Sequence, residues 1–123
     1  MNLVQAQIVP VTAGSGYFAS QSSNVFHNAE QGMGIKVFIN VTSAGSGSIT
    51  PVISYFDANS IQYPALSGAA ITSNGKTVLT IHPSLTAVTN VTLNDVIPSN
   101  LKIDINANNA NVMNYSAAYT ILK

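Results

Sequence analysis

The stretch Ile35-Lys36-Val37-Phe38-Ile39-Asn40-Val41-Thr42 decides the fold class of this chain. Every second residue is aliphatic, and the residues between them are polar except Phe38. This two-residue period is typical of a half-buried β-strand, because successive side chains leave opposite faces of a pleated backbone. The stretch Leu101-Lys102-Ile103-Asp104-Ile105-Asn106 repeats the pattern. The sequence therefore predicts a strand at both places.

The same alternation, separated by turn residues, predicts short strands along most of the chain. No segment shows a helical period of 3.6 residues over three turns. In the last strand we expect one set of alternate side chains to point one way, namely Met113, Tyr115, Ala117, Tyr119 and Ile121. The expected strands are residues 3–12, 17–19, 25–27, 34–43, 49–57, 61–63, 69–72, 77–82, 91–93, 101–107 and 112–122.

Three loops are expected to join neighbouring antiparallel strands. Asn74-Gly75 tolerates positive φ at both residues, so it predicts a tight type I′ hairpin between residues 69–72 and 77–82. Residues 108–111 are expected to close a final hairpin. Residues 43–48 have turn composition and can join the strands on either side.

We therefore expect an all-β fold, an antiparallel β-sandwich of about eight strands and of jelly-roll or Greek-key type. Residues 1–123 would form one domain, which at this length buries roughly two thirds of its unfolded surface. Such a core needs no disulfide, which agrees with the absence of cysteine. Residues 1–30 are the least regular part and are expected to form an irregular N-terminal arm.

Charged residues are scarce. They make up 7% of the chain, against about 25% in an average globular domain. Four lysines balance four acidic residues, so the net charge is zero and gives no basic surface for nucleic acid or an anionic membrane. A near-neutral chain is prone to self-association, which suits a subunit of a larger assembly.

Neither a secretion signal nor a spanning helix is expected. The N-terminus, Met1-Asn2-Leu3-Val4-Gln5, has no basic region followed by an apolar one, so we expect the mature chain to begin where the sequence does. No apolar run approaches the roughly 18 residues that a membrane helix needs.

Candidates for catalysis or metal binding are few. A hydrolase needs a nucleophile, a base and an orienting group, and no Gly-x-Ser-x-Gly motif accompanies His27 or His82. The two histidines are also too isolated for a zinc site of three or four ligands. We therefore expect no enzyme and no cofactor.

The acidic residues favour structural roles. The segment Asp57-Ala58-Asn59-Ser60 begins like a calcium loop but lacks the later glycine and acid, so an ordinary side-chain-capped turn is favoured. A glycosidase needs facing carboxylates, and the chain offers only Glu30, Asp57, Asp95 and Asp104. Tyr63 is the candidate for a surface aromatic that stacks on sugar, whereas Tyr55, Tyr115 and Tyr119 are expected in the core.

From Gly34 to Thr42 the chain resembles a family of small virion proteins of tailed bacteriophages. Their strand follows the pattern glycine, hydrophobic, any, Val, any, Val or Ile, Asp or Asn, Val, Thr. A short loop and a second strand come next, here ending Ile53-Ser54-Tyr55-Phe56-Asp57. The succession continues to the final strands and covers about residues 8–122. Ser60 and Ser99 depart from it, because glycine and arginine are common there.

The resemblance implies a capsid decoration or cement protein, carried on the exterior of the virion and made in the host cytoplasm. The expected partners are the major capsid protein and further copies of this chain, most simply as a homotrimer. No nucleic acid, membrane or small-molecule substrate is expected. Many modest contacts that bridge neighbouring capsomers would add up to tight binding. The alternative is a tail or fibre β-module that binds cell-surface glycan.

The N-terminal arm is the expected anchor, because its strand-like pieces can add to the edge of a neighbour's sheet. The residues expected to contact a partner there are Leu3, Val4, Ile8, Val9, Val11, Tyr17 and Phe18.

Overall fold

The structure is a computed structural model that describes residues 8–28 and 31–123. Within these ranges it has ten strands and no helix, so the predicted all-β fold is confirmed. A helix able to cross a membrane is accordingly absent from these ranges. The strands are β1 (Ile8–Pro10), β2 (Gly16–Phe18), β3 (Gln21–His27), β4 (Gly34–Ser43), β5 (Ile49–Phe56), β6 (Gln62–Ser67), β7 (Gly75–Ile81), β8 (Thr92–Leu93), β9 (Asn100–Ala107) and β10 (Met113–Leu122).

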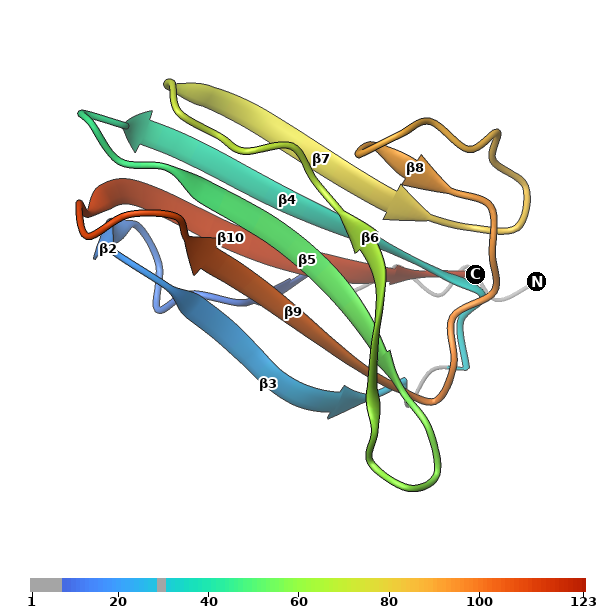
Figure 1. Cartoon of the computed structure of the whole chain (residues 1–123). Helices are drawn as coiled ribbons and strands as arrows, with labels where there is room; N and C mark the ends of the chain where they lie inside the picture. Colours follow the sequence, from blue (N-terminus) through green and yellow to red (C-terminus); the bar gives the residue numbers. More distant parts are fainter. Residues whose placement is uncertain (1–7, 29–30) are drawn as a thin grey trace.

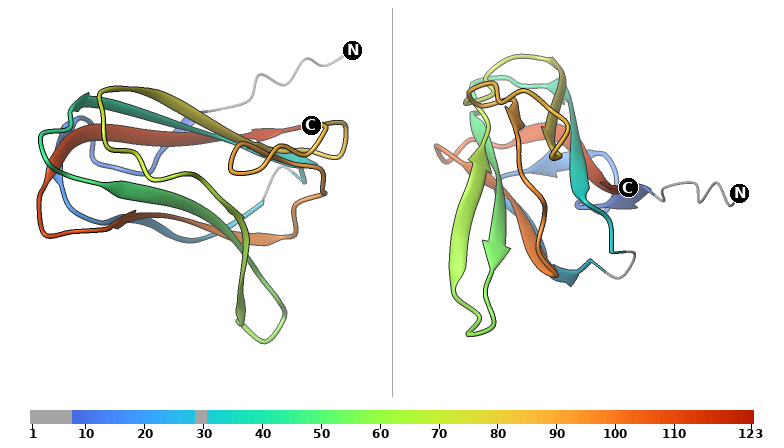
Figure 2. Two further views of the ribbon diagram at one scale, coloured as in Figure 1. Left: turned by 45° about the horizontal axis from the view of Figure 1, so that its top comes forward. Right: turned by 90° about the vertical axis from the view of Figure 1, so that its right-hand side faces the viewer.

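The strands form two sheets that pack face to face (Figure 1, Figure 2). Sheet A has the order β1-β10-β4-β7-β8, and β2 pairs with β10 on the same side as β1. Sheet B has the order β3-β9-β5-β6. With β1 and β2 counted as one interrupted strand and β8 as an addition, this is the strand order of a jelly roll. Only β7 and β8 pair in parallel among the described strands.

The core lies between the sheets and is made by alternate residues of the long strands. All five side chains expected on one face of β10 are buried, so that prediction is confirmed. Ile35, Val37, Ile39 and Val41 form the matching buried row on β4. This alternation is what a strand with one face on the core requires.

The predicted Asn-Gly hairpin is wrong. Ile71 bridges to Ile49 at the edge of sheet B, whereas Gly75 begins β7 in sheet A. Asn74 therefore lies in a crossover between the sheets, and its side-chain oxygen accepts a hydrogen bond of 2.8 Å from the Ala44 amide. The dipeptide permits a sharp change of direction but does not determine which sheet the next strand joins.

The predicted closing hairpin is also wrong, although its strand boundaries are right within a residue or so. β9 belongs to sheet B and β10 to sheet A, so residues 108–112 cross between the layers. Residues 44–48 likewise carry the chain from sheet A to sheet B. Among the described strands, β5 and β6 are the consecutive antiparallel pair that does form a hairpin.

Residues 8–28 are part of both sheets, which differs from the irregular arm expected for this range. β1 and β2 pair with opposite ends of β10, and β3 pairs with β9. Between β1 and β2 the chain bulges, so that the amides of Val11 and Thr12 both donate to the Ala117 carbonyl, at 2.8 and 3.3 Å. β1 ends at Pro10, two residues before the end of the strand expected at residues 3–12.

Candidate functional site

The residues expected to contact a partner fall into two groups. Leu3 and Val4 lie outside the described residues. Ile8 and Tyr17 are 62% and 63% exposed on the outer face of sheet A. The inward residues of the same edge strand, Val9, Val11 and Phe18, pack against the core instead.

A row of four apolar side chains crosses the outer face of sheet A. Pro10 of β1 lies opposite Ala118 of β10, Ala118 lies opposite Phe38 of β4, and Phe38 lies opposite Val78 of β7. We call these four residues the outer-face row. They line a depression of about 330 Å³, which is at the small end of the usual range for binding pockets.

Two lysines border the outer-face row on opposite sides. Lys36 precedes Phe38 on β4 and lies opposite Thr80, whereas Lys76 precedes Val78 on β7 and lies opposite Asn40. From strand geometry their Cα atoms are about 14 Å apart. Neither lysine forms an ion pair with any described residue. The outward side chains of β1, β2, β4, β7 and β10 include no acid. Beside the outer-face row they include Asn40, Ser116 and Thr120, so the apolar row lies on a neutral polar face with two lysines.

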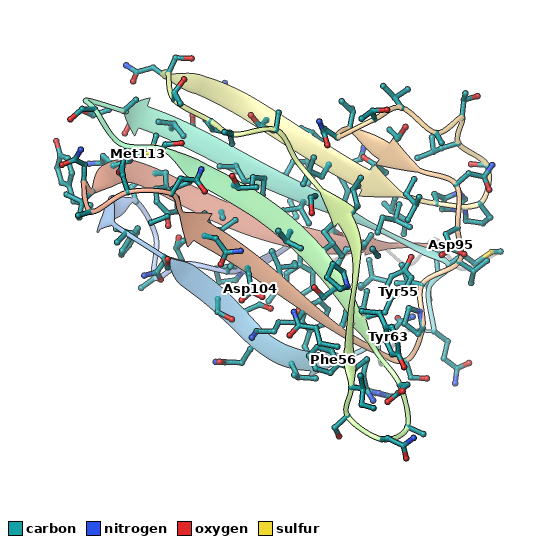
Figure 3. The ribbon with its side chains drawn as sticks, in the orientation of Figure 1. Tyr55, Phe56, Tyr63, Asp95, Asp104 and Met113 are labelled. Carbon is teal, nitrogen blue, oxygen red and sulfur yellow. The ribbon has the colours of Figure 1, made fainter. Side chains whose placement is uncertain are left out.

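The described carboxylates lie elsewhere. Asp104 of β9 pairs with Lys102 at 3.5 Å on sheet B. Asp95, on the loop between β8 and β9, lies near Tyr55 (Figure 3). Asp57 lies in the turn of the β5–β6 hairpin and binds Tyr63. Although the net charge of the chain is zero, Lys36 and Lys76 lie on the outer face of sheet A, whereas the described carboxylates lie on sheet B and on the loops beside it.

The two tyrosines near the hairpin are direct cross-strand partners, and each binds a different carboxylate. The Tyr55 hydroxyl donates to Asp95 at 3.1 Å, and the Tyr63 hydroxyl donates to Asp57 at 2.8 Å. Burial, and then the Asp95 charge, raises the pKa of Tyr55. The hydrogen bond to Asp57 raises the pKa of Tyr63. Both phenols therefore remain protonated donors at neutral pH.

Asp57 holds the tip of the β5–β6 hairpin in one shape. Its Oδ1 accepts hydrogen bonds from the amides of Asn59 and Ile61, at 2.8 and 3.0 Å, as expected for a side-chain-capped turn. The Ile61 amide, followed by the Tyr63 hydroxyl, lowers the pKa of Asp57, so the carboxylate stays charged. Ser60 has a φ of 62°, in the region that favours the glycine common at this place in the resembling family.

The two histidines lie far apart in the fold, and their side-chain partners among the described residues are an amide and a hydroxyl. His27 Nδ1 lies 3.4 Å from the Asn100 side-chain oxygen. His82 Nδ1 lies 2.7 Å from the Ser84 hydroxyl, and its Nε2 lies 2.9 Å from the Lys123 carbonyl. No group of three or more His, Cys, Asp or Glu side chains gathers in residues 8–28 and 31–123, and Glu30 lies outside them.

The outer-face row was not expected from the sequence, although one signal for it is there. Phe38 is the one break in the polar alternation of residues 35–42. Its neighbours in the row come from three other strands, so recognising them requires the register of sheet A. Tyr63, by contrast, is 51% exposed, which agrees with the prediction that it is a surface aromatic.

The described surface thus has two features of opposite character, an apolar row bordered by lysines and a hairpin tip that carries the Asp57 carboxylate. Both are suited to binding. In comparisons with known proteins, no family model matches the chain, and no curated protein matches it.

Proposed function

We propose that the chain is a non-enzymatic structural protein of a tailed-phage virion, a decoration protein that binds the capsid exterior as a homo-oligomer and stabilises it by bridging capsomers. The observation that carries this proposal is the apolar outer-face row together with Ile8 and Tyr17, which are exposed at the open edge of the same sheet. Exposed apolar side chains that gather on one face mark interaction sites.

The open edge suits the capsid contact. β1 and β2 pair with β10 on one side, and no described strand pairs with their other side. A capsid segment in extended conformation would add main-chain hydrogen bonds there, while Ile8 and Tyr17 would contribute apolar contact. Neutral contacts of this kind are little affected by salt, and many copies on one head would multiply them.

The fold is compatible with this role, since jelly rolls recur in viral capsid proteins and in lectins. That support is an analogy of fold, and a fold hosts many functions. The resemblance of residues 8–122 to small virion proteins points the same way.

Co-sedimentation with DNA-free heads of the encoding phage tests the proposal. We expect the wild-type chain to pellet with heads and the double variant Ile8→Ser, Tyr17→Ser to remain in the supernatant. The matched control is Val25→Ser, Val88→Ser, which removes two side chains that are 54% and 50% exposed away from this edge and should pellet normally. A wild-type chain that never pellets with heads would refute the proposal.

A second candidate function is glycan binding by a tail or fibre module, favoured by the exposed Tyr63 ring with Asp57 beside it. An aromatic face and a carboxylate acceptor are groups that sugars can use. On a glycan array, Tyr63→Ala should abolish any signal and Tyr17→Ala should preserve it. An unchanged signal after Tyr63→Ala would count against this function.

A further inference from the structure

We infer that copies of this chain bind one another head to tail, with the β5–β6 hairpin tip of one copy seated in the depression over the outer-face row of the next. The inference rests on the proposed function, whose oligomer it would explain. It concerns the isolated chain, however, and can be tested without heads.

The first support is shape. The β5–β6 hairpin extends beyond the rest of the sandwich (Figure 1, Figure 2). Its tip carries two large apolar side chains, Ile61 and Tyr63, which are 52% and 51% exposed. The depression of about 330 Å³ beside Phe38 and Val78 is an open apolar hollow on the same molecule. A projection and a hollow on one chain allow a contact between copies.

The second support is charge. Asp57 lies at the tip, and Lys76 lines the hollow without an ion pair to any described residue. Lys36 lies on the same face, two residues before Phe38. Seating the tip in the hollow brings Asp57 of one copy close to Lys76 of the next, beside the apolar outer-face row. Electrostatic complementarity of this kind selects the partner and the orientation of binding.

The third support is the rigidity of the tip. Asp57 already accepts three hydrogen bonds, from the amides of Asn59 and Ile61 and from the Tyr63 hydroxyl. The exposed side chains of the tip are therefore held before binding, so less conformational entropy is lost on association.

The same charges disfavour a symmetric contact between two outer faces. In a two-fold interface the same patch occurs twice. Lys36 and Lys76 of both copies would then gather, with no acid of this face among the described residues to offset them. A head-to-tail contact is the alternative, and it generates a closed ring when the rotation closes. A ring of three would agree with the trimer expected from the sequence.

Sedimentation velocity of the full chain tests the inference through charge reversal. The wild-type chain should sediment as a multiple of its 12.8 kDa mass. The face variant Lys36→Glu, Lys76→Glu should dissociate, with at least about a tenfold higher dissociation constant. The tip variant Asn59→Lys, Ile61→Lys should do the same, and it leaves the carboxylate of Asp57 in place. The control Lys102→Glu, on sheet B, should keep the wild-type mass.

The decisive experiment restores opposite charges on the face and the tip. The chain that carries all four substitutions has an acidic face and a basic tip, so it should reassociate. If that chain does not fold by circular dichroism, an equimolar mixture of the separately folded face and tip variants should associate instead. A monomeric wild type, an unaffected face or tip variant, or a failure of both restoration experiments would overturn the inference.

Head binding distinguishes this inference from the proposed function. A chain that is monomeric alone yet pellets with heads would overturn the head-to-tail contact and leave the decoration role standing. An oligomer that responds to the substitutions as described above but never pellets with heads would support the head-to-tail contact and refute the decoration role.

Discussion

The hydroxyl of Tyr115 donates a hydrogen bond of 2.7 Å to the carbonyl oxygen of Ala19, which lies 96 residues earlier in the chain. The Tyr115 ring is fully buried, and Phe18 packs edge-on against it with ring centroids 5.5 Å apart. One side chain of the central strand β10 therefore fixes the end of β2 and the start of the passage to β3.

Tyr115→Phe should lower the free energy of unfolding by about 1–2 kcal/mol, because the ring stays and only the hydrogen bond is lost. The measurement is the midpoint of urea denaturation. Tyr17→Phe is the matched control, since Tyr17 is 63% exposed, and it should leave the midpoint unchanged. Equal effects of the two substitutions would show that the hydroxyl of Tyr115 contributes nothing.

Alkaline pH should destabilise the fold through the buried tyrosines. Burial raises the pKa of Tyr115 from 10.0 to about 12 and raises that of Tyr119 as well. Between these values the native state holds protons that the unfolded state has released, so the free energy of unfolding falls as pH rises. Denaturation midpoints should therefore fall between about pH 10 and pH 12, and less steeply in Tyr115→Phe. A flat profile would contradict the burial effect.

Gly34→Ala should be among the most damaging small substitutions. A Cβ there would meet the carbonyl oxygen of Ile81 and the His82 side chain, and the backbone of a paired strand cannot move away. We expect a loss of about 3 kcal/mol, measured by urea denaturation. Gly45→Ala is the contrast, since a Cβ there meets nothing and only the φ of 54° is strained. A cost at Gly45 equal to that at Gly34 would be inconsistent with this steric account.

The Asp57 carboxyl should titrate below its usual pKa of 3.8, because the Ile61 amide and the Tyr63 hydroxyl both donate to it. Its contribution to stability is present above that usual value and is lost as pH falls through the lowered pKa. Carboxyl NMR should show the pKa of Asp57 rising in Tyr63→Phe but not reaching 3.8, since the Ile61 amide remains. Tyr55→Phe should leave this titration unchanged, and a response to it would refute the assigned partners.

Strand positions were predictable because a strand with one buried face shows alternating apolar and polar residues within its own sequence. The expected strand at residues 34–43 coincides with β4 (Gly34–Ser43), and the inward face of β10 was identified residue by residue. Both follow from an alternation that one buried face imposes.

Strand partners were not predictable in the same way. Asn74-Gly75 and residues 108–111 have the composition of hairpin turns, yet both cross between sheets. Turn residues supply the backbone conformation, whereas the partner of the next strand depends on contacts with distant segments. The outer-face row shows the same limit, because Phe38 meets Ala118 and Val78 only through register.

The positions of β9 and β10 have a consequence for biosynthesis. Each lies inside its sheet, β9 between β3 and β5 and β10 between β1 and β4, yet both are translated after all the other described strands. Until they leave the ribosome, β1, β2 and β3 have no partner strand in the described fold. The nascent chain therefore exposes unpaired β-segments that contain few charged residues, and this state is prone to aggregation. Demand for chaperones should be greatest just before β9 and β10 emerge from the ribosome.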